Sequence, residues 1–335
     1  MKINKHQFSL DTTERDRQWE EHRRHFKDYC VNRYQWHSYP KWAYVAPFPL
    51  HVDFESSFRC NLNCPMCLRH HLDRKQYGDM EFGLFKKGID ECADNGLYSI
   101  RLSWRGEPTM NPRLPEMVAY AKDKGIKEVS FITNGTNLTE DLSTALIQAG
   151  LDYITISVDG LKHNYDKLRQ PSTFEGVSER IATLHRLKEA IGGGYPRVKI
   201  QGIWEFLKED PSGFYAHFKG ITDLISYDPY HDYSKMELVQ DEQAVCQYPW
   251  QRVTITWTGE IPLCITDWNL AHPIGDLRTQ TIKEIWHGQA LEDYRAMQLA
   301  RRRMEITACK RCYRHAVPQL GHLRAGHRPD EAFES

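Results

Sequence analysis

Residues 59–67 read Arg-Cys-Asn-Leu-Asn-Cys-Pro-Met-Cys, and they follow a stretch, residues 50–54, in which apolar and polar side chains alternate. Such alternation is typical of a β-strand. Cys60, Cys64 and Cys67 are therefore expected in a loop at the end of a strand, where three thiols within eight residues can converge on one metal centre. Iron–sulfur clusters are normally held by cysteine thiolates. A four-iron cluster held by three cysteines leaves one iron open to a further ligand.

Zinc is the alternative occupant of this loop. A structural zinc site closes with four ligands, usually two Cys-x-x-Cys pairs or cysteines with histidine partners. His70 and His71 follow the third cysteine and could supply a fourth ligand. The loop alone therefore leaves both kinds of centre open.

Around this loop the sequence alternates between strand-like and helix-like segments. Strands are predicted at 50–54, 98–104, 128–133, 153–158 and 198–203, with a weaker sixth unit at 214–227, and helices at 82–95, 114–124, 140–149 and 174–191. Such alternation implies a parallel sheet. Six units are too few for a closed eight-fold barrel. We therefore predict an α/β fold, an open and partial (β/α)6 TIM-like barrel.

In parallel α/β folds, functional side chains gather at the carboxyl ends of the strands. This rule places five segments around one cavity: residues 56–67, 104–108, 133–136, 157–160 and 201–204. Most of the unusual residues of the sequence lie in these segments.

The composition is globular, with 40% hydrophobic and 27% charged residues and a formal net charge of −1 over 335 residues. This charge balance favours neither nucleic acid nor a membrane surface as a partner. Only residues 301–303, three arginines, form a dense basic run, and a solvated helix face is its simplest interpretation. No apolar run is long enough to cross a bilayer, and the first thirty residues lack the apolar core of a secretory signal. A cytoplasmic location is predicted, where thiols stay reduced and the nine cysteines need a reason other than disulfides.

A second group of cysteines lies near the carboxyl end: Cys246, Cys264, Cys309 and Cys312. The first two flank a predicted hairpin, 253–257 and 260–264, and a helix is predicted at 282–299. Four cysteines can make one closed site, and a zinc ribbon has similar spacings. The divisions expected are an N-terminal helical extension (1–47, with a helix at 12–37), the barrel (48–239), a small cysteine-rich hairpin and helix appendage (240–320) and a tail (321–335).

The Cys-x-x-x-Cys-x-x-Cys spacing after the first strand resembles that of the radical S-adenosylmethionine (SAM) superfamily. The resemblance implies a four-iron cluster on Cys60, Cys64 and Cys67 whose open iron binds SAM. One electron, supplied by an external flavodoxin- or ferredoxin-type donor, would then cleave SAM to methionine and a 5′-deoxyadenosyl radical. That radical abstracts hydrogen from the substrate, which is chemistry that a cofactor must supply.

Later strands carry motifs that extend this resemblance. Residues 105–108 read Arg-Gly-Glu-Pro and resemble the Gly-Gly-Glu-Pro element that binds the SAM amino group, with Arg105 in place of the first glycine. The resemblance assigns the following residues to SAM binding: Met66, where relatives often carry an aromatic residue, Gly106, Glu107, Pro108, Asn134, Ser157, Arg169 and Gln201. Arg169 suits the SAM carboxylate because its guanidinium group offers a bidentate fork.

The C-terminal cysteine pattern resembles the SPASM/twitch appendage of the same superfamily. The resemblance implies one auxiliary four-iron cluster held by Cys246, Cys264, Cys309 and Cys312. Asp267 lies three residues after Cys264 and is a candidate catalytic base. Cys92 falls on an apolar helix face and is expected in the core. Cys30 is the remaining thiol, and a hydrogen-donor role is its alternative to a surface position.

The sequence leaves three functions open. The first is a radical SAM enzyme that dehydrogenates, epimerises or dehydrates a sugar- or cyclitol-like small molecule, favoured because the first 47 residues are too short for a leader-binding winged helix. The second is radical modification of a ribosomal peptide or a protein side chain, by epimerisation or cross-linking. The third is a zinc-stabilised binding module without redox chemistry.

Overall fold

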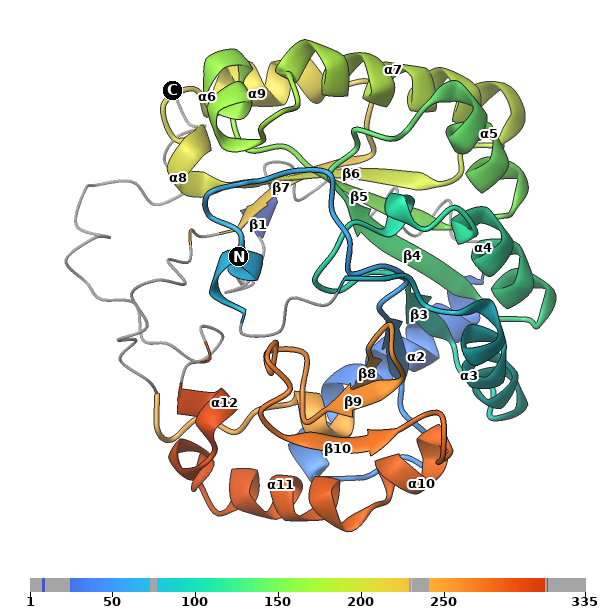
Figure 1. Ribbon diagram of the computed structural model, residues 1–335, viewed down its shortest axis with the longest axis vertical. Helices are drawn as coiled ribbons and strands as arrows, with labels where there is room; N and C mark the ends of the chain where they lie inside the picture. Colours follow the sequence, from blue (N-terminus) through green and yellow to red (C-terminus); the bar gives the residue numbers. More distant parts are fainter. Residues whose placement is uncertain are drawn as a thin grey trace.

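The computed structural model in Figure 1 describes residues 8–9, 25–72, 77–228, 230, 241–310 and 312. Among these residues, one eight-stranded sheet has the order β1-β7-β6-β5-β4-β3-β2-β8. The strands are β1 (Phe8–Ser9), β2 (His51–Phe54), β3 (Ser99–Arg101), β4 (Glu128–Thr133), β5 (Tyr153–Ser157), β6 (Arg197–Ile203), β7 (Leu224–Asp228) and β8 (Arg252–Ile255). Strands β2 to β8 run parallel to their neighbours, and β1 pairs with β7 antiparallel. The sheet curves but does not close, so the predicted partial barrel is confirmed.

Helices cover the outer face of the sheet (Figure 1). They are α3 (Phe82–Asp94), α4 (Leu114–Asp123), α5 (Glu140–Gln148), α6 (Lys162–Leu168), α7 (Phe174–Ile191), α8 (Trp204–Leu207) and α9 (Pro211–Phe218). The outward side chains of the strands are apolar: the Phe54 ring packs edge-on against Phe85 of α3, with centroids 5.3 Å apart. A Cβ at Gly88 would lie 2.7 Å from the same Phe54 ring, so glycine lets α3 approach the sheet.

The inward side chains of β2, β3 and β8 are polar or charged, and His51 and Asp53 among them are buried. The register of the sheet sets Asp53 opposite Arg101 and Thr254. Asp53 is inaccessible to solvent and forms ion pairs with Arg101 (Nη2–Oδ1 2.8 Å) and Arg252 (Nε–Oδ2 3.1 Å), and Arg252 Nη2 also donates to Oδ1 at 3.3 Å. Burial alone would raise the pKa of Asp53, but the two guanidinium groups outweigh it and hold this pKa well below its usual range. The first strands thus present a polar wall to the barrel interior.

His51 belongs to the same cluster and predicts a pH dependence of stability. Burial, with Arg252 nearby, lowers the pKa of His51 from its ordinary 6.5 to about 4, although Asp53 opposes the shift. The unfolded chain therefore takes up a proton near pH 6.5 that the folded chain refuses until about pH 4. The contribution of His51 to the free energy of unfolding is therefore complete above pH 6.5 and is lost as the pH falls towards 4. At pH 5 the loss amounts to about 2 kcal/mol.

The measurement compares melting temperatures at pH 7.5 and pH 5.0 for the wild type and for His51→Gln. Glutamine can still hydrogen bond to Ser99, whose hydroxyl lies 2.7 Å from His51 Nδ1, but it does not titrate. We expect the melting temperature of the variant to fall less between the two pH values. An equal fall in both proteins would contradict the role of His51.

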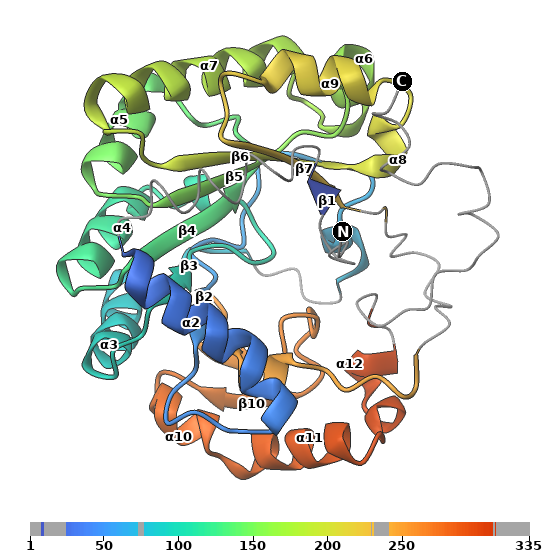
Figure 2. The same ribbon diagram turned by 180° about the vertical axis from the view of Figure 1, so that it is seen from behind.

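Helix α2 (Phe26–Ser38) lies beside β2 and β3, as Figure 2 shows, and contacts the segments that lead into β2 and β8. Asn32 Nδ2 donates to the carbonyl of Leu50, just before β2, at 3.2 Å. Gln251 Nε2, just before β8, donates to the carbonyl of Trp36 at 2.8 Å. The helix predicted at 12–37 is thus present from residue 26, and its first part lies outside the described residues. Helix α2 thus packs at the amino ends of β2 and β8, the ends opposite the cysteine loop.

The C-terminal part differs from the prediction in two ways. The strand predicted at 253–257 is β8, which pairs with β2 in the barrel sheet, whereas β9 (Glu260–Pro262) pairs with β10 (Pro273–Asp276). The two arms are still joined at a turn where Gly259 has a φ of 96°. The helix predicted at 282–299 is divided into α10 (Ile282–Trp286) and α11 (Gln289–Leu299), because Gly288 takes an extended conformation between them.

The arginine run at 301–303 is solvated only in part, since Arg301 and Arg302 are exposed and Arg303 is not. Arg303 is completely buried, and its Nη1 donates to the carbonyl of Asp241 at 2.9 Å. The remaining elements are α12 (Thr307–Lys310) and the short 3₁₀ helices η1 (Pro40–Trp42), η2 (Leu68–His71), η3 (Pro108–Met110), η4 (Tyr248–Trp250) and η5 (Arg303–Glu305). Within the described residues, no helix combines the length and the apolar character that a membrane span requires.

Candidate cluster and cofactor site

The cysteine loop leaves the carboxyl end of β2 and is held by backbone contacts on several sides. The amide of Asn63 donates to the carbonyl of Gln170 at 2.9 Å, and the amide of Glu107 donates to that of Arg59 at 2.7 Å. Arg59 forms an ion pair with Asp79, and its guanidinium group also donates to the carbonyl of Met110 at 2.7 Å. The loop therefore lies over the carboxyl ends of the strands, where the sequence places it.

The three thiols of this loop are close enough to influence one another. The pKa of Cys64 is raised to about 11, chiefly by burial and also by the neighbouring Cys67 and Cys60, while Arg169 acts in the opposite sense. Burial likewise raises the pKa of Cys60. All three are free thiols. Because metal binding requires the thiolate, crowded thiols of this kind suit a cationic centre that pulls their protons off.

Glu107 follows β3 and lies next to the carboxyl end of β4. Its carboxylate is buried and accepts hydrogen bonds from the Thr109 hydroxyl at 2.6 Å, the Thr133 hydroxyl at 2.6 Å and the Asn134 amide at 2.7 Å. Burial raises the pKa of Glu107, and these donors oppose the shift. Asn134 Nδ2 in turn lies 3.9 Å from Cys60 Sγ. The Arg-Gly-Glu-Pro motif and the end of β4 thus meet the cysteine loop.

Gly106 and Pro108 shape this motif. A Cβ at Gly106 would lie 2.3 Å from the carbonyl oxygen of Ser57 and 2.7 Å from Phe58, so only glycine lets the two loops cross. Pro108 is buried and begins η3. Met66 is half-buried at the centre of the cysteine loop.

Arg169 and Gln201 are both engaged by carboxylates. Nε and Nη2 of Arg169 donate to Asp159 Oδ2, the first at 2.7 Å. Burial lowers the pKa of Arg169, but Asp159 more than compensates and raises it above its usual value. Gln201 Nε2 donates to Asp228 Oδ2 at 2.6 Å. Ser157 ends β5, opposite Gln201 in the register, and is half-buried.

The second group of cysteines lies in the C-terminal part. Burial raises the pKa of Cys246 above its usual value, and Cys264, Cys312 and Cys309 each raise it further. Burial raises the pKa of Cys264 to about 12. All four thiols are free; Cys246, Cys309 and Cys312 are buried, and Cys264 is half-buried. Among the described residues, neither group of cysteines brings three side chains close enough together to hold a single metal ion, whereas a four-iron cluster binds each cysteine to a different iron.

Polar side chains that the sequence did not single out surround these thiols. The Thr266 hydroxyl lies 3.1 Å from Cys264 Sγ and 3.9 Å from Cys312 Sγ. Tyr294 Oη and Gln298 Nε2 lie 3.7 Å and 3.6 Å from Cys309 Sγ. Donors aimed at sulfur are typical of metal-bound thiolates. Helical spacing of Tyr294 and Gln298 was the available signal, since both fall on one face of α11.

Asp267 is turned into its own loop. Its two carboxylate oxygens accept from the amides of Ala271 and His272, each at 2.9 Å, and the residue is 3% exposed. These contacts stabilise the turn after Cys264, and the catalytic role remains a prediction. Cys92 is fully buried on α3, as expected. Cys30 is exposed on α2, at the end of the barrel opposite the cysteine loop.

Two protein-family models match the chain. The model of the radical SAM superfamily matches residues 54–208, and the SPASM model, an iron–sulfur cluster-binding domain, matches residues 246–313. The chain therefore carries a radical SAM domain and, after it, a SPASM domain. A radical SAM domain binds a four-iron cluster and SAM, and a SPASM domain binds auxiliary iron–sulfur clusters, so iron–sulfur clusters rather than zinc are the expected occupants of the two cysteine groups.

Relatives in sequence match only parts of the chain. It is 32% identical over 151 residues to the tungsten-containing aldehyde ferredoxin oxidoreductase cofactor-modifying protein of Pyrococcus furiosus. This match covers 44% of the chain and 42% of that protein. It is 38% identical over 111 residues to Fe-coproporphyrin III synthase of Methanosarcina barkeri, which covers 33% of the chain and 27% of that protein. The matches thus span less than half of either relative.

Solved structures share the fold over most of the chain. BtrN in complex with AdoMet and 2-DOIA matches with a TM-score of 0.58 at 19% identity, over 80% of this chain and 94% of that chain. Streptococcus suis SuiB bound to its precursor peptide SuiA matches with a TM-score of 0.56 at 13% identity, over 78% of this chain and 69% of that chain. At these identities the likeness shows the fold alone.

Proposed function

We propose that the protein uses a four-iron cluster on Cys60, Cys64 and Cys67 to cleave SAM and to abstract a hydrogen atom from a small-molecule substrate. The observation that carries this proposal is the gathering of these three free thiols over the strand ends, beside Glu107 and Arg169. When bound, the cluster supplies one electron, which breaks a sulfonium carbon–sulfur bond of SAM and yields methionine and the hydrogen-abstracting 5′-deoxyadenosyl radical. The electron comes from an external one-electron donor of the flavodoxin or ferredoxin type.

Residues of the chain itself bind SAM and orient it for this cleavage. Glu107 is a carboxylate acceptor for the SAM ammonium group, and the donors from Thr109, Thr133 and Asn134 hold it in a fixed rotamer. Arg169 provides a fork for the SAM carboxylate while Asp159 fixes its orientation. The half-buried Ser157 and Met66, with Gly106, Pro108 and Gln201, complete the set of proposed SAM contacts.

The four C-terminal cysteines hold an auxiliary four-iron cluster. With Cys246, Cys264, Cys309 and Cys312 all as ligands, no iron of this cluster is free for substrate. Electron transfer or shaping of the cavity is therefore its role. Thr266, Tyr294 and Gln298 direct polar groups at the cysteine sulfurs, and hydrogen bonds to sulfur are one way in which a protein sets the potential of a cluster.

A small molecule, sugar- or cyclitol-like, is the proposed substrate, and dehydrogenation, epimerisation or dehydration the proposed reaction. Two observations support it. The fold match with BtrN, whose structure contains 2-DOIA, covers nearly all of that protein, while the match with SuiB covers 69% of it. The end of β7 also offers the Asp228 carboxylate, which accepts a hydrogen bond from Gln201 and can accept others from hydroxyl groups. Modification of a peptide is the second candidate, favoured by the fold match with SuiB bound to SuiA.

Deuterium transfer tests both candidates in one assay. The reduced enzyme is incubated with SAM and either perdeuterated cyclitols and amino sugars or a panel of deuterated peptides, and 5′-deoxyadenosine is analysed by mass spectrometry. Deuterium in 5′-deoxyadenosine with a sugar or cyclitol supports the proposal. Deuterium transfer from peptides alone would replace it with the second candidate.

A further inference from the structure

Arg105, which stands where relatives carry a glycine, is a buried and fully engaged cation. Its side chain is 2% exposed, and the guanidinium fork meets the carboxylate of Glu55 in a bidentate pair, with Nε–Oε1 at 2.8 Å and Nη2–Oε2 at 2.7 Å. Glu55 follows β2 directly and is itself inaccessible to solvent. A buried, bidentate pair of this kind fixes the orientation of the guanidinium group.

The third nitrogen of the Arg105 guanidinium group, Nη1, reaches the SPASM domain. Arg105 Nη1 donates to the carbonyl of Trp268 at 2.8 Å, and the neighbouring Trp104 Nε1 donates to the carbonyl of Ile265 at 2.8 Å. Both acceptors belong to residues 264–270, which we name the Cys264 loop because it begins at that auxiliary cysteine. Two consecutive side chains of the SAM-binding motif region therefore hold the backbone of one loop at two points.

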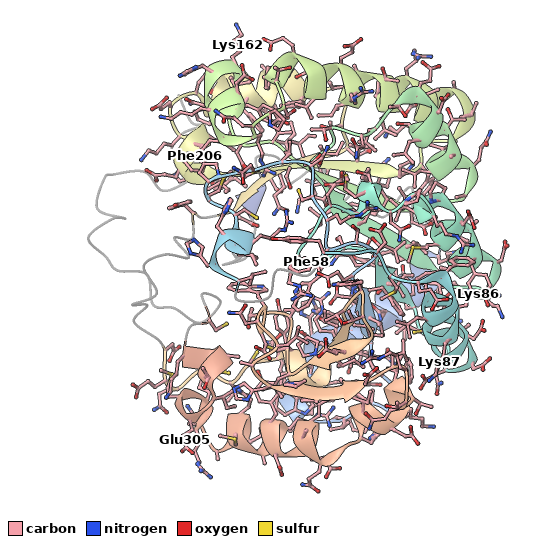
Figure 3. All side chains as sticks on the ribbon, in the orientation of Figure 1. Phe58, Lys86, Lys87, Lys162, Phe206 and Glu305 are labelled. Carbon is pink, nitrogen blue, oxygen red and sulfur yellow. The ribbon has the colours of Figure 1, made fainter. Side chains whose placement is uncertain are left out.

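Two aromatic rings lie against the guanidinium group. Its Cζ lies 4.2 Å from the centroid of Phe58 and 4.1 Å from that of Trp104. Phe58 belongs to the cysteine loop, and Figure 3 shows it between the barrel strands and the C-terminal part. The amide of Trp257, after β8, also donates to Glu55 Oε2 at 3.2 Å. One ion pair thus joins the cysteine loop, the Arg-Gly-Glu-Pro motif, the end of β8 and the Cys264 loop.

We propose that Trp104 and Arg105 form a clamp that fixes the Cys264 loop, and with it the auxiliary cluster, against the SAM-binding motif. Arg105 acts through the backbone that it holds and is a positioning residue. Glycine at this position would remove the fork, the third hydrogen bond and the ring contacts together. The inference rests on the proposed function for the identity of the two centres, but the clamp itself is a contact between segments that needs neither centre to be measured.

The test measures hydrogen exchange in residues 263–272 of the reconstituted protein, together with the EPR spectrum of the reduced auxiliary cluster. Amides of Asp267, Leu270 and Ala271 are hydrogen-bonded within this segment and report its opening. In Arg105→Gly we expect these amides to exchange at least about tenfold faster, since the loop loses a hydrogen bond to a charged group. Trp104→Phe, which keeps a ring but loses Nε1, should give a smaller change in the same direction. Both variants should shift the auxiliary spectrum.

Lys188→Met is the matched control. It breaks another buried ion pair, between Lys188 Nζ and Asp223 Oδ2 at 2.7 Å, on α7 far from the Cys264 loop (Figure 1). This variant should leave the exchange of residues 263–272 and the auxiliary spectrum unchanged. Wild-type exchange and spectra in both Arg105→Gly and Trp104→Phe would overturn the clamp. If Arg105→Gly does not fold, Trp104→Phe and Glu55→Gln decide the question.

The two proposals fail in different ways. Without radical SAM activity, the wild type releases no 5′-deoxyadenosine from SAM, although the exchange difference can still be present. Without the clamp, 5′-deoxyadenosine is released and the exchange difference is absent. If both proposals are right, Arg105→Gly still cleaves SAM, the amides of its Cys264 loop exchange faster, and the EPR spectrum of its auxiliary cluster is altered.

Discussion

Replacing Cys60, Cys64 and Cys67 together by alanine is expected to abolish the release of 5′-deoxyadenosine from SAM. The physical reason is that the open iron exists only while these three thiolates hold the cluster, and no protein side chain can generate such a radical. Iron content should fall from about eight to about four per chain, because the four C-terminal cysteines still hold their own cluster. Iron and sulfide analysis under anaerobic conditions, with chromatography of the nucleoside product, measures both effects.

Cys30→Ala is the control for that experiment. Its thiol is exposed on α2, away from both groups of cysteines, so activity and iron content should match those of the wild type. Full iron content in the triple variant would contradict the assignment of the three thiols. So would a loss of activity in Cys30→Ala as large as in the triple variant.

Arg169→Ala should weaken the binding of SAM by about 100-fold, since removing one partner of a hydrogen-bonded charge pair costs 2–5 kcal/mol. Two losses combine in this variant. SAM loses the fork for its carboxylate, and Asp159, which is 1% exposed, is left as a buried charge without its guanidinium partner. Equilibrium dialysis of SAM with the reconstituted, unreduced protein measures the dissociation constant, and iron analysis shows that the cluster is retained.

Asp159→Asn separates the two contributions. An asparagine keeps the shape and one acceptor for Arg169 Nε but removes the charge, so we expect about a tenfold loss of SAM affinity. If Arg169→Ala binds SAM as the wild type does, Arg169 has only a structural role in the pair with Asp159. If Asp159→Asn is weaker than Arg169→Ala, the fork is not the group that SAM contacts.

The barrel could be predicted because local sequence patterns indicate its strands. Each outward face is a run of alternate apolar residues, such as Val52 and Phe54, and each strand is followed by a helix with its own stop signal. Strand β8 could not be assigned in the same way. Its sequence suits a hairpin with residues 260–264, whereas its pairing with β2 joins segments about two hundred residues apart, which no local pattern encodes. The two-residue β1 is too short to carry a pattern at all.

The residues of the site likewise fall into those that a local pattern indicates and those that only distant contacts show. Cys60, Cys64, Cys67 and the Gly106-Glu107 pair were found because spacing along the chain carries them. Glu55, Trp104 and Thr266 were missed because their importance lies in contacts with distant segments. Arg303 was misjudged because a run of charges looks solvated unless its buried acceptor, the Asp241 carbonyl, is known. Arg105 was visible only as a departure from the family pattern, and the structure supplies its partners.

The most direct measurement takes the wild-type protein, reconstituted with iron and sulfide in the absence of oxygen. Its reduced EPR spectrum is recorded with and without SAM, and the nucleoside products are quantified after reduction. The account predicts that SAM changes the spectrum of one of two clusters and that methionine and 5′-deoxyadenosine form in equal amounts. A spectrum insensitive to SAM, with no 5′-deoxyadenosine formed, would contradict it.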